Sequence, residues 1–298
     1  MTHQYHPLGF EGSRIAQGYW RLNEWGMSDQ ELVSFIEQSI AAGITTVDHA
    51  DIYGDYQCES LFGQALKLKP SLRDQLQIVT KCGILLPSKH RPDISSHRYD
   101  QSTQHIIQSV DRSLQNLNVD NIELLLLHRP TPLMDADHIA EAFEHLFTVG
   151  KVTHFGVSNF TPQQVDLLQS RLPMPLVVNQ VELSPLELKH FKDGTLEHAQ
   201  QHAITPMAWS PFAGGDLFKL EGIDPTLHQA MTQIAETHNA SLDQIALAWL
   251  IRHPSGIAPV IGSGKIERVK AAQQALTIEL SDKEWFEIWV ASQGHPVP

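Results

Sequence analysis

Short apolar runs alternate along the chain with segments whose apolar residues recur at helical spacing. The runs predicted as strands span 14–20, 45–48, 77–81, 123–128, 153–158, 176–180, 205–210 and 258–262. Most of them are continuously apolar rather than alternating, which is typical of parallel strands that are buried on both faces. The pattern therefore predicts a parallel sheet covered by helices.

Helix signals lie between these runs. Capping boxes begin at Ser28, Ser241 and Ser281, because each serine is followed three residues later by Glu or Gln. Thr161 is predicted to cap a helix whose first residue is Pro162. The predicted apolar helix faces consist of Leu32, Phe35, Ile36 and Ile40; of Ile107, Val110, Leu114 and Leu117; and of Ile139, Phe143, Leu146 and Phe147. The segment 225–253 has room for two helices rather than one.

Eight strands that are each followed by a helix predict an α/β fold, a single (β/α)8 TIM barrel spanning 1–298. The alternative is an open doubly wound sheet, which should carry G-x-G-x-x-G after an early strand. The first predicted strand leads instead into GYWRLN (18–23), which lacks that motif. The barrel is therefore the favoured fold, with its active site at the C-terminal ends of the strands.

Composition narrows the function classes. The chain has 298 residues and a formal net charge of −13, which disfavours nucleic acid or an anionic membrane as the main partner. Its two cysteines, Cys58 and Cys82, cannot form a disulfide framework. The N-terminal segment has no apolar core of a signal peptide, and the longest aliphatic run is only 124–127. We therefore expect a cytoplasmic protein with a small-molecule substrate; the sequence does not indicate an oligomeric state.

Polar or aromatic residues end most of the predicted strands. These residues are Asp48, Lys81, His128, Ser158 with Asn159, Gln180, and Trp209 with Ser210. In a barrel the C-terminal strand ends share one rim, and the chemistry of such folds gathers there. Any one of these residues alone is more often structural than catalytic, so the prediction rests on their common position.

Tyr53, Lys81, Asp48 and His128 form a chemically coherent set at that rim. Tyrosine has an ordinary pKa of about 10, and a nearby ammonium should lower it. Lys81 can supply the ammonium, Asp48 can fix its position, and His128 can bind a carbonyl oxygen. This set predicts an acid catalyst that needs neither a nucleophile nor a metal, and a carbonyl that is protonated there requires a hydride, for which nicotinamide is the usual source.

A catalytic metal is not expected, although the chain has seventeen histidines. His3 and His6 lie close to the N-terminus, His49 and Asp51 do not form the H-x-H of barrel hydrolases, and no H-E-x-x-H occurs. Cys82 follows Lys81 directly and is a candidate oxidant sensor, but a small buried residue is the favoured interpretation.

Several segments resemble the motifs of the aldo-keto reductase family, in the same order along nearly the whole chain. They are GITTVDHADIYGDYQCESLFGQAL (43–66), VTKCG (79–83), LLLLHRP (124–130), GKVTHFGVSNF (150–160), MAWSPFAGG (207–215) and VIGSGKIERV (260–269). HRPTPLMD (128–135) most resembles a bacterial branch of predicted oxidoreductases. The resemblance implies NADPH-dependent reduction of aldehydes or ketones, with Tyr53 as general acid, Lys81 and Asp48 tuning it, and His128 orienting the substrate.

The resemblance also implies a binding site for NADPH/NADP+. The cofactor residues would be Gly18, Tyr19, Trp20, Asp48, Ser158, Asn159, Gln180, Trp209, Ser210, Pro211, Phe212, Gly214, Leu217, Gly262, Ser263, Gly264, Lys265 and Arg268. Ser263, Lys265 and Arg268 favour the 2′-phosphate of NADPH over NADH. The chain departs from the family where adenine contacts are common, because Ala271 and Ala272 stand there; Gln273 could replace them.

The substrate pocket would be lined by Trp20, His49, Tyr53, His128, Arg129 and Phe160. Two other function classes stay open: a cofactor-binding regulatory barrel similar to potassium-channel β-subunits, and a metal-dependent barrel hydrolase. The first would bind cofactor without turnover, and the second would work without nicotinamide and lose activity to chelators.

Overall fold

The computed structural model describes residues 12–219 and 224–298. Within them, parallel strands close into a barrel in the order β1-β10-β9-β8-β7-β6-β3-β2. These strands are β1 (Ala16–Gly18), β2 (Thr46–Asp48), β3 (Gln77–Cys82), β6 (Ile122–Leu127), β7 (Val152–Ser158), β8 (Leu176–Glu182), β9 (Thr205–Trp209) and β10 (Ala258–Ile261). The predicted (β/α)8 barrel and each of its eight strands are confirmed.

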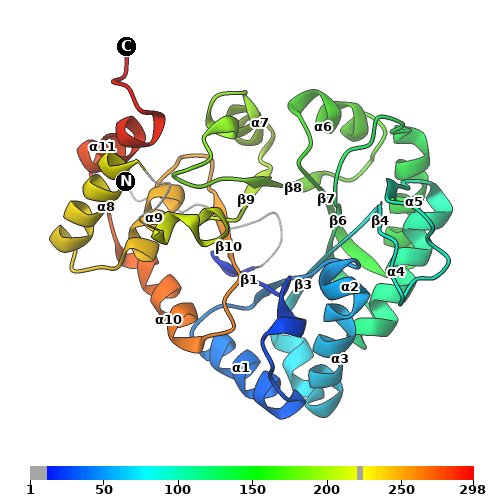
Figure 1. Cartoon of the computed structure of the whole chain (residues 1–298). Helices are drawn as coiled ribbons and strands as arrows, with labels where there is room; N and C mark the ends of the chain where they lie inside the picture. Colours follow the sequence, from blue (N-terminus) through cyan, green and yellow to red (C-terminus); the bar gives the residue numbers. More distant parts are fainter. Residues whose placement is uncertain (1–11, 220–223) are drawn as a thin grey trace.

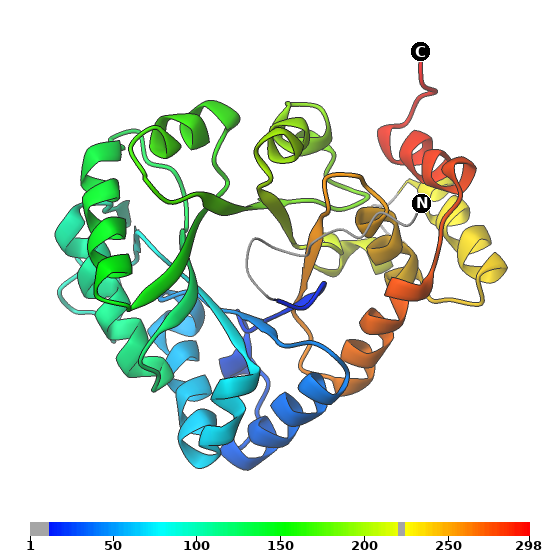
Figure 2. The ribbon, with the colours of Figure 1, turned by 180° about the vertical axis from the view of Figure 1, so that it is seen from behind.

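Helices form a ring around the barrel, as both views show (Figure 1, Figure 2). They are α1 (Asp29–Ala41), α3 (Cys58–Leu68), α4 (Thr103–Leu117), α5 (Ala136–Thr148), α6 (Pro162–Gln169), α7 (Thr195–His202), α8 (Pro225–Thr237), α9 (Leu242–Ile251), α10 (Ile266–Gln274) and α11 (Asp282–Gln293). The capping boxes at Ser28, Thr161, Ser241 and Ser281 all form. The two helices expected within 225–253 are α8 and α9. In the described ranges, every helix is too short or too polar to cross a bilayer.

Two details differ from the sequence predictions. A short antiparallel ladder follows β3, where β4 (Ile84–Leu85) pairs with β5 (Arg98–Tyr99); neither strand was predicted, because each is only two residues long. Phe147 was assigned to the buried face of α5, but its side chain is 50% exposed, while Phe143 and Leu146 are buried. The apolar residues of α5 therefore extend beyond the face that packs against the core.

Small and branched apolar side chains from neighbouring strands fill the barrel interior. The inner cluster contains Ala16, Val79, Leu124, Leu126, Val177, Val178, Met207, Ala258 and Val260. Gly156 on β7 is required there, because a Cβ would lie 2.6 Å from the Val178 carbonyl oxygen and 2.7 Å from a Leu126 methyl group. This packed interior gives the rim above it a rigid floor.

Candidate active site

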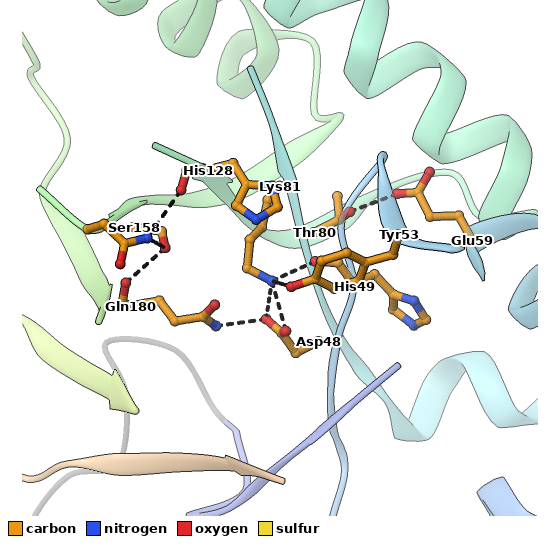
Figure 3. Close-up of polar contacts among 10 residues, drawn as sticks. Asp48, His49, Tyr53, Glu59, Thr80, Lys81, His128, Ser158 and Gln180 are labelled. Atoms are coloured by element: carbon orange, nitrogen blue, oxygen red, sulfur yellow. Dashed lines mark hydrogen bonds and ion pairs between the residues drawn. The ribbon is translucent and has the colours of Figure 1, made fainter. Parts of the chain in front are cut away.

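Lys81 is at the centre of the polar rim and its side chain is completely buried (Figure 3). Its Nζ lies 2.8 Å from each carboxylate oxygen of Asp48, 2.8 Å from the His49 carbonyl oxygen and 3.1 Å from the Tyr53 hydroxyl. Burial lowers the pKa of Lys81, but Asp48 and Tyr53 more than offset it, so the net direction is upward. Lys81 therefore stays charged, and its three N–H groups are shared among these partners.

The alternation of side-chain direction along a strand explains why Asp48 and Lys81 meet. Successive residues of a strand point to opposite faces, so Asp48 on β2 and Lys81 on β3 both point into the barrel. Gln180 on β8 reaches across the barrel, and its Nε2 donates to Asp48 Oδ1 at 2.8 Å. Asp48 is thus held from two sides, by an ammonium and by an amide. The Gln180 contact with Asp48 was not predicted, because it joins residues far apart in the chain.

Tyr53 begins a distorted turn, α2 (Tyr53–Tyr56), that follows β2. Gly54, Asp55 and Tyr56 all have left-handed backbone, with φ of 56°, 58° and 66°. Gly54 has no room for a side chain, because a Cβ there would lie 2.4 Å from Cys58 Sγ. The Tyr56 hydroxyl accepts from the Leu86 N–H at 2.8 Å and ties the turn to the segment after β4. The turn is therefore fixed at both ends.

The Tyr53 hydroxyl accepts a hydrogen bond from Lys81, so its own proton points elsewhere and is free for another acceptor. Lys81 was expected to lower the pKa of Tyr53. In the structure, burial raises the pKa of Tyr53 and Lys81 lowers it, and the net direction is upward. The expected direction is therefore corrected: the buried phenol keeps its proton more firmly than a tyrosine in water.

His128 follows β6, and its ring faces the Tyr53 ring edge-to-face with centroids 5.8 Å apart. Burial, together with the charges of Lys81 and Arg129, holds the pKa of His128 well below its ordinary value. The imidazole is therefore neutral at neutral pH, with one nitrogen as donor and one as acceptor. Its buried Nδ1 has no hydrogen-bond partner among the described residues.

A second polar network lies at the ends of β7, β8 and β9. Asn159 has left-handed backbone (φ 62°), and its amide donates to Ser158 Oγ at 2.8 Å. The Trp209 indole N–H donates to Asn159 Oδ1 at 3.0 Å, and Ser158 Oγ donates to the Gln180 carbonyl at 2.8 Å. The structure thus brings together Ser158, Asn159, Gln180 and Trp209, as the sequence predicted. The Arg129 guanidinium lies over the Trp209 ring, 5.5 Å from its centroid.

The loop after β9 has the backbone shape needed for close approach to a ligand. Ser210, Gly214 and Gly215 have positive φ values of 50°, 67° and 103°, and a short 3-10 helix spans Ala213–Phe218. Pro211 and Leu217 are buried, and Leu217 packs in the core. Phe212 packs beneath the loop at the edge of the core.

The segment after β10 places exposed cations at the start of α10. Lys265 precedes the helix and Arg268 lies in its first turn, and both side chains are exposed. Neither forms an ion pair in residues 12–219 and 224–298. Cations are disfavoured at a helix N-terminus, so an anionic ligand would relieve this arrangement. Together with Ser263, Gly262 and the β9 loop, these residues fit a dinucleotide that carries a further phosphate.

Three predicted contact residues do not face the rim. Tyr19 and His49 stack on each other with ring centroids 4.9 Å apart, and both pack against Phe62 of α3. Phe160 is buried in the core around α4 and α5. The expectations that the side chains of Tyr19, His49 and Phe160 line the site are corrected. Strand alternation turns Tyr19 and His49 toward the helices, and Phe160 faces the helices because the left-handed backbone of Asn159 interrupts the alternation after Ser158. His49 still contributes its carbonyl oxygen to Lys81.

Gly18 and Trp20 lie on either side of Tyr19. Gly18 faces β10 so closely that a Cβ would lie 3.2 Å from the Ile261 carbonyl oxygen, and Trp20 is 56% exposed. The suggestion that Gln273 replaces the missing adenine contacts is not favoured either, because its amide nitrogen lies beside Gly43, close to where a Cβ there would stand.

Two residues near the β10 segment were not predicted. Gln17 Nε2 donates to the Ser263 carbonyl at 3.1 Å. The Trp25 indole covers Gly264 so closely that a Cβ there would lie 2.6 Å from the ring. Their signal in the sequence was weak, since a lone Gln and a lone Trp carry no motif. Both side chains fix the loop that ends in Lys265.

Comparison with known proteins agrees with this geometry. The chain is 52% identical over 293 residues to the oxidoreductase YdhF of Escherichia coli, covering 98% of this chain and 97% of that protein. It is 41% identical over 288 residues to a 6-dehydroglucose reductase of Agrobacterium fabrum, covering 96% of each chain. The aldo-keto reductase from Klebsiella pneumoniae, solved in complex with NADPH, superposes with a TM-score of 0.78 at 26% identity, covering 96% of this chain and 92% of that one. The model of the aldo/keto reductase family matches residues 14–291. The chain therefore belongs to the aldo/keto reductase family.

Proposed function

We propose that the protein is an NADPH-dependent oxidoreductase that reduces aldehydes or ketones to alcohols, with Tyr53 as the proton donor. The observation that carries this proposal is the hydrogen bond from Lys81 Nζ to the Tyr53 hydroxyl, which leaves the phenolic proton free. Family membership and the NADPH complex of the Klebsiella relative support the cofactor. The nicotinamide, when bound, supplies the hydride.

Each residue of the rim has a defined task in this reaction. The carbonyl oxygen gains the Tyr53 proton as the carbonyl carbon gains the hydride, so an alcohol forms and a phenolate remains. The buried Lys81 ammonium stabilises that phenolate, and Asp48 and Gln180 hold Lys81 in place. Neutral His128 can donate a hydrogen bond to the same carbonyl oxygen without adding charge. Solvent then returns a proton to Tyr53.

The cofactor would lie across the strand ends from the Asn159 network to α10. Ser158, Asn159 and Gln180 offer amide and hydroxyl groups for the carboxamide, and Trp209 offers a ring for stacking. The loop from Ser210 would enclose the pyrophosphate, and Ser263, Lys265 and Arg268 would hold the 2′-phosphate. Replacing Arg268 by Ala should raise KM for NADPH by about 10–100-fold and leave KM for NADH unchanged, since one charge-assisted contact is lost.

A polyhydroxylated aldehyde is the substrate that the mouth of the site favours. The exposed Trp20 ring and the Arg129 guanidinium over Trp209 offer an apolar face and fixed donors beside His128. The Agrobacterium relative is named a 6-dehydroglucose reductase, and this supports a sugar that carries an aldehyde at C6. Such a sugar should have a higher kcat/KM than a simple aromatic aldehyde. Arg129→Met should reduce that preference without changing turnover of the aromatic aldehyde.

The direct test is oxidation of NADPH by the purified protein with a nitrobenzaldehyde and with a C6-aldehyde sugar. Turnover with NADPH that exceeds turnover with NADH supports the proposal. Tight NADPH binding with no turnover over a broad carbonyl panel would instead support the regulatory barrel. Activity without nicotinamide that is lost to chelators would support the hydrolase.

A further inference from the structure

A cluster of metal-ligating side chains lies on the outer helices, away from the rim. It consists of Asp166 on α6 and of His198 and His202 on α7. Helices α6 and α7 follow β7 and β8 in the ring of helices (Figure 1). The carbonyl chemistry does not use these residues, and this inference does not rest on the proposed function.

The three ligand atoms converge. His198 and His202 are four residues apart, so they project from the same face of α7. Asp166 Oδ1 lies 2.8 Å from His198 Nε2 and 3.9 Å from His202 Nε2. The imidazole rings are 4.4 Å apart between centroids. The atoms all lie within 4.8 Å of one another, so both rings present their nitrogens to one carboxylate.

We propose that Asp166, His198 and His202 bind a divalent transition metal ion of the class to which Zn²⁺ belongs. Zn²⁺ takes imidazole nitrogen at about 2.0–2.1 Å and carboxylate oxygen at about 2.0–2.2 Å in a tetrahedron, which places neighbouring ligand atoms about 3.3 Å apart. To reach that separation, the distance from Asp166 to His198 would increase by about 0.5 Å and the distance from Asp166 to His202 would decrease by about 0.6 Å. Side-chain rotations of this size need no movement of the helices.

The donor set also selects the class of ion. Two imidazoles and one carboxylate suit Zn²⁺, Cu²⁺ and Ni²⁺, whereas Mg²⁺ and Ca²⁺ prefer oxygen ligands throughout. His198 is 12% exposed, while Asp166 and His202 are 58% and 41% exposed. The ion would therefore be held firmly on one side and reached from solvent on the other, where water completes its coordination.

Metal binding would join α6 to α7. The strand before α6 carries Ser158, and the strand after α7 carries Trp209. The bound ion would therefore link the two helices beside the strands that carry the Asn159 network. An ion that binds only the folded chain stabilises it by mass action. At a free concentration of about 100 times Kd, Zn²⁺ should raise Tm by about 4–8 °C.

The test uses the full chain with His3 and His6 replaced by Gln, so that this N-terminal pair cannot bind the probe. Calorimetric titration with Zn²⁺ should give one ion per chain at this cluster, and His198→Gln with His202→Gln should weaken it at least about 10-fold and abolish the rise in Tm. The matched control is His138→Gln, because His138 Nδ1 lies 3.7 Å from Asp135 in a pair without a second imidazole. That variant should bind Zn²⁺ as its parent does.

A crystal soaked in Zn²⁺ gives a second measurement that does not depend on how the variants fold. Anomalous density within bonding distance of His198 Nε2, His202 Nε2 and Asp166 Oδ1 supports the site. Absence of density there, or Zn²⁺ affinity and Tm shifts that are equal in the parent and in the double variant, would overturn it.

Discussion

The inner and outer faces of β2 and β3 both carry buried polar residues, but these residues have different partners. On the inner face Asp48 and Lys81 pair with each other and with Tyr53 at the rim. On the outer face Thr80 donates to the buried Glu59 of α3 at 2.7 Å, and His49 packs against aromatic rings. A shift of one residue along a strand therefore separates groups that can meet a substrate from groups that hold helices.

Charge on the two faces differs as well. On the inner face Lys81 keeps its charge because Asp48 and Tyr53 compensate for burial. On the outer face, burial and the Lys81 charge lower the pKa of His49 to about 3, and burial raises the pKa values of Glu59 and Cys82. The outer face thus favours neutral forms.

The largest effect is expected for Lys81→Met, which removes the inner charge. The reduction rate should fall by about 10²–10⁴-fold, because the Tyr53 phenolate loses its stabilising ammonium. The free energy of unfolding should fall by about 3–5 kcal/mol, because Asp48 is left buried and unpaired. Single-turnover kinetics and urea unfolding measure the two effects. Lys151→Met is the control, since the Lys151 side chain forms a surface ion pair with Asp111. Equal losses in both variants would refute the inner-face assignment.

The pH dependence of reduction should be set by ionisation of Tyr53, which lies beside the inner-face residues. The raised pKa of Tyr53 keeps the acid protonated, so kcat/KM should stay flat from about pH 6 to about pH 9 and fall once the pH passes the raised value, above about 10. The free energy of unfolding should also fall at high pH. A tyrosine in the unfolded chain ionises near about pH 10, before the buried Tyr53 does, so unfolding becomes easier as the pH rises past that value. An inflection near 6.5 would show that His128 titrates there and would contradict its lowered pKa.

Thr80→Val tests the outer face with nearly unchanged shape. Glu59 would lose the hydroxyl that donates to it, so the free energy of unfolding should fall by about 1–3 kcal/mol. Turnover per folded molecule should not change, because Thr80 points away from the rim. Urea unfolding and active-site-normalised kcat measure these effects. A large drop in kcat with normal stability would mean that the two faces are coupled more strongly than their contacts indicate.

The smallest effect is expected for thiol reagents. Cys82 is 1% exposed and burial raises the pKa of its thiol well above the ordinary value, and Cys58 is completely buried with a raised pKa as well. Neither should react with a disulfide reagent at neutral pH until the protein unfolds, and activity should be unchanged. Rapid labelling of Cys82 in the folded protein, with loss of turnover, would restore the oxidant-sensor hypothesis.

The sequence predicted the parts of the fold that follow from local pattern. Continuous apolar runs located the strands, and the caps at Ser28, Thr161 and Ser281 located helix starts. The polar strand ends located Asp48, Lys81 and His128 at one rim, because parallel strands of a barrel share their C-terminal edge. The extent of the single domain and the cytoplasmic location stay predictions.

The remaining features depend on side-chain direction and burial, which a linear pattern does not fix. Tyr19, His49 and Phe160 lie next to rim residues in the sequence but point outward in space. The bond from Gln180 to Asp48 crosses the barrel, and the upward shift of the Tyr53 pKa comes from burial that only the packed structure creates. Period-two alternation, counted from Asp48 or Lys81, would have identified His49 and Cys82 as outward-facing.

The most direct test of Tyr53 as the proton donor is single-turnover oxidation of bound NADPH by a carbonyl substrate in the wild type and in Tyr53→Phe. Cofactor affinity is measured in the same samples by fluorescence titration. NADPH binding should be unchanged in the variant, and its rate of hydride transfer should be lower by about 10²–10⁴-fold, because the phenolic proton is missing. Hydride transfer at the wild-type rate in Tyr53→Phe would contradict this role of Tyr53.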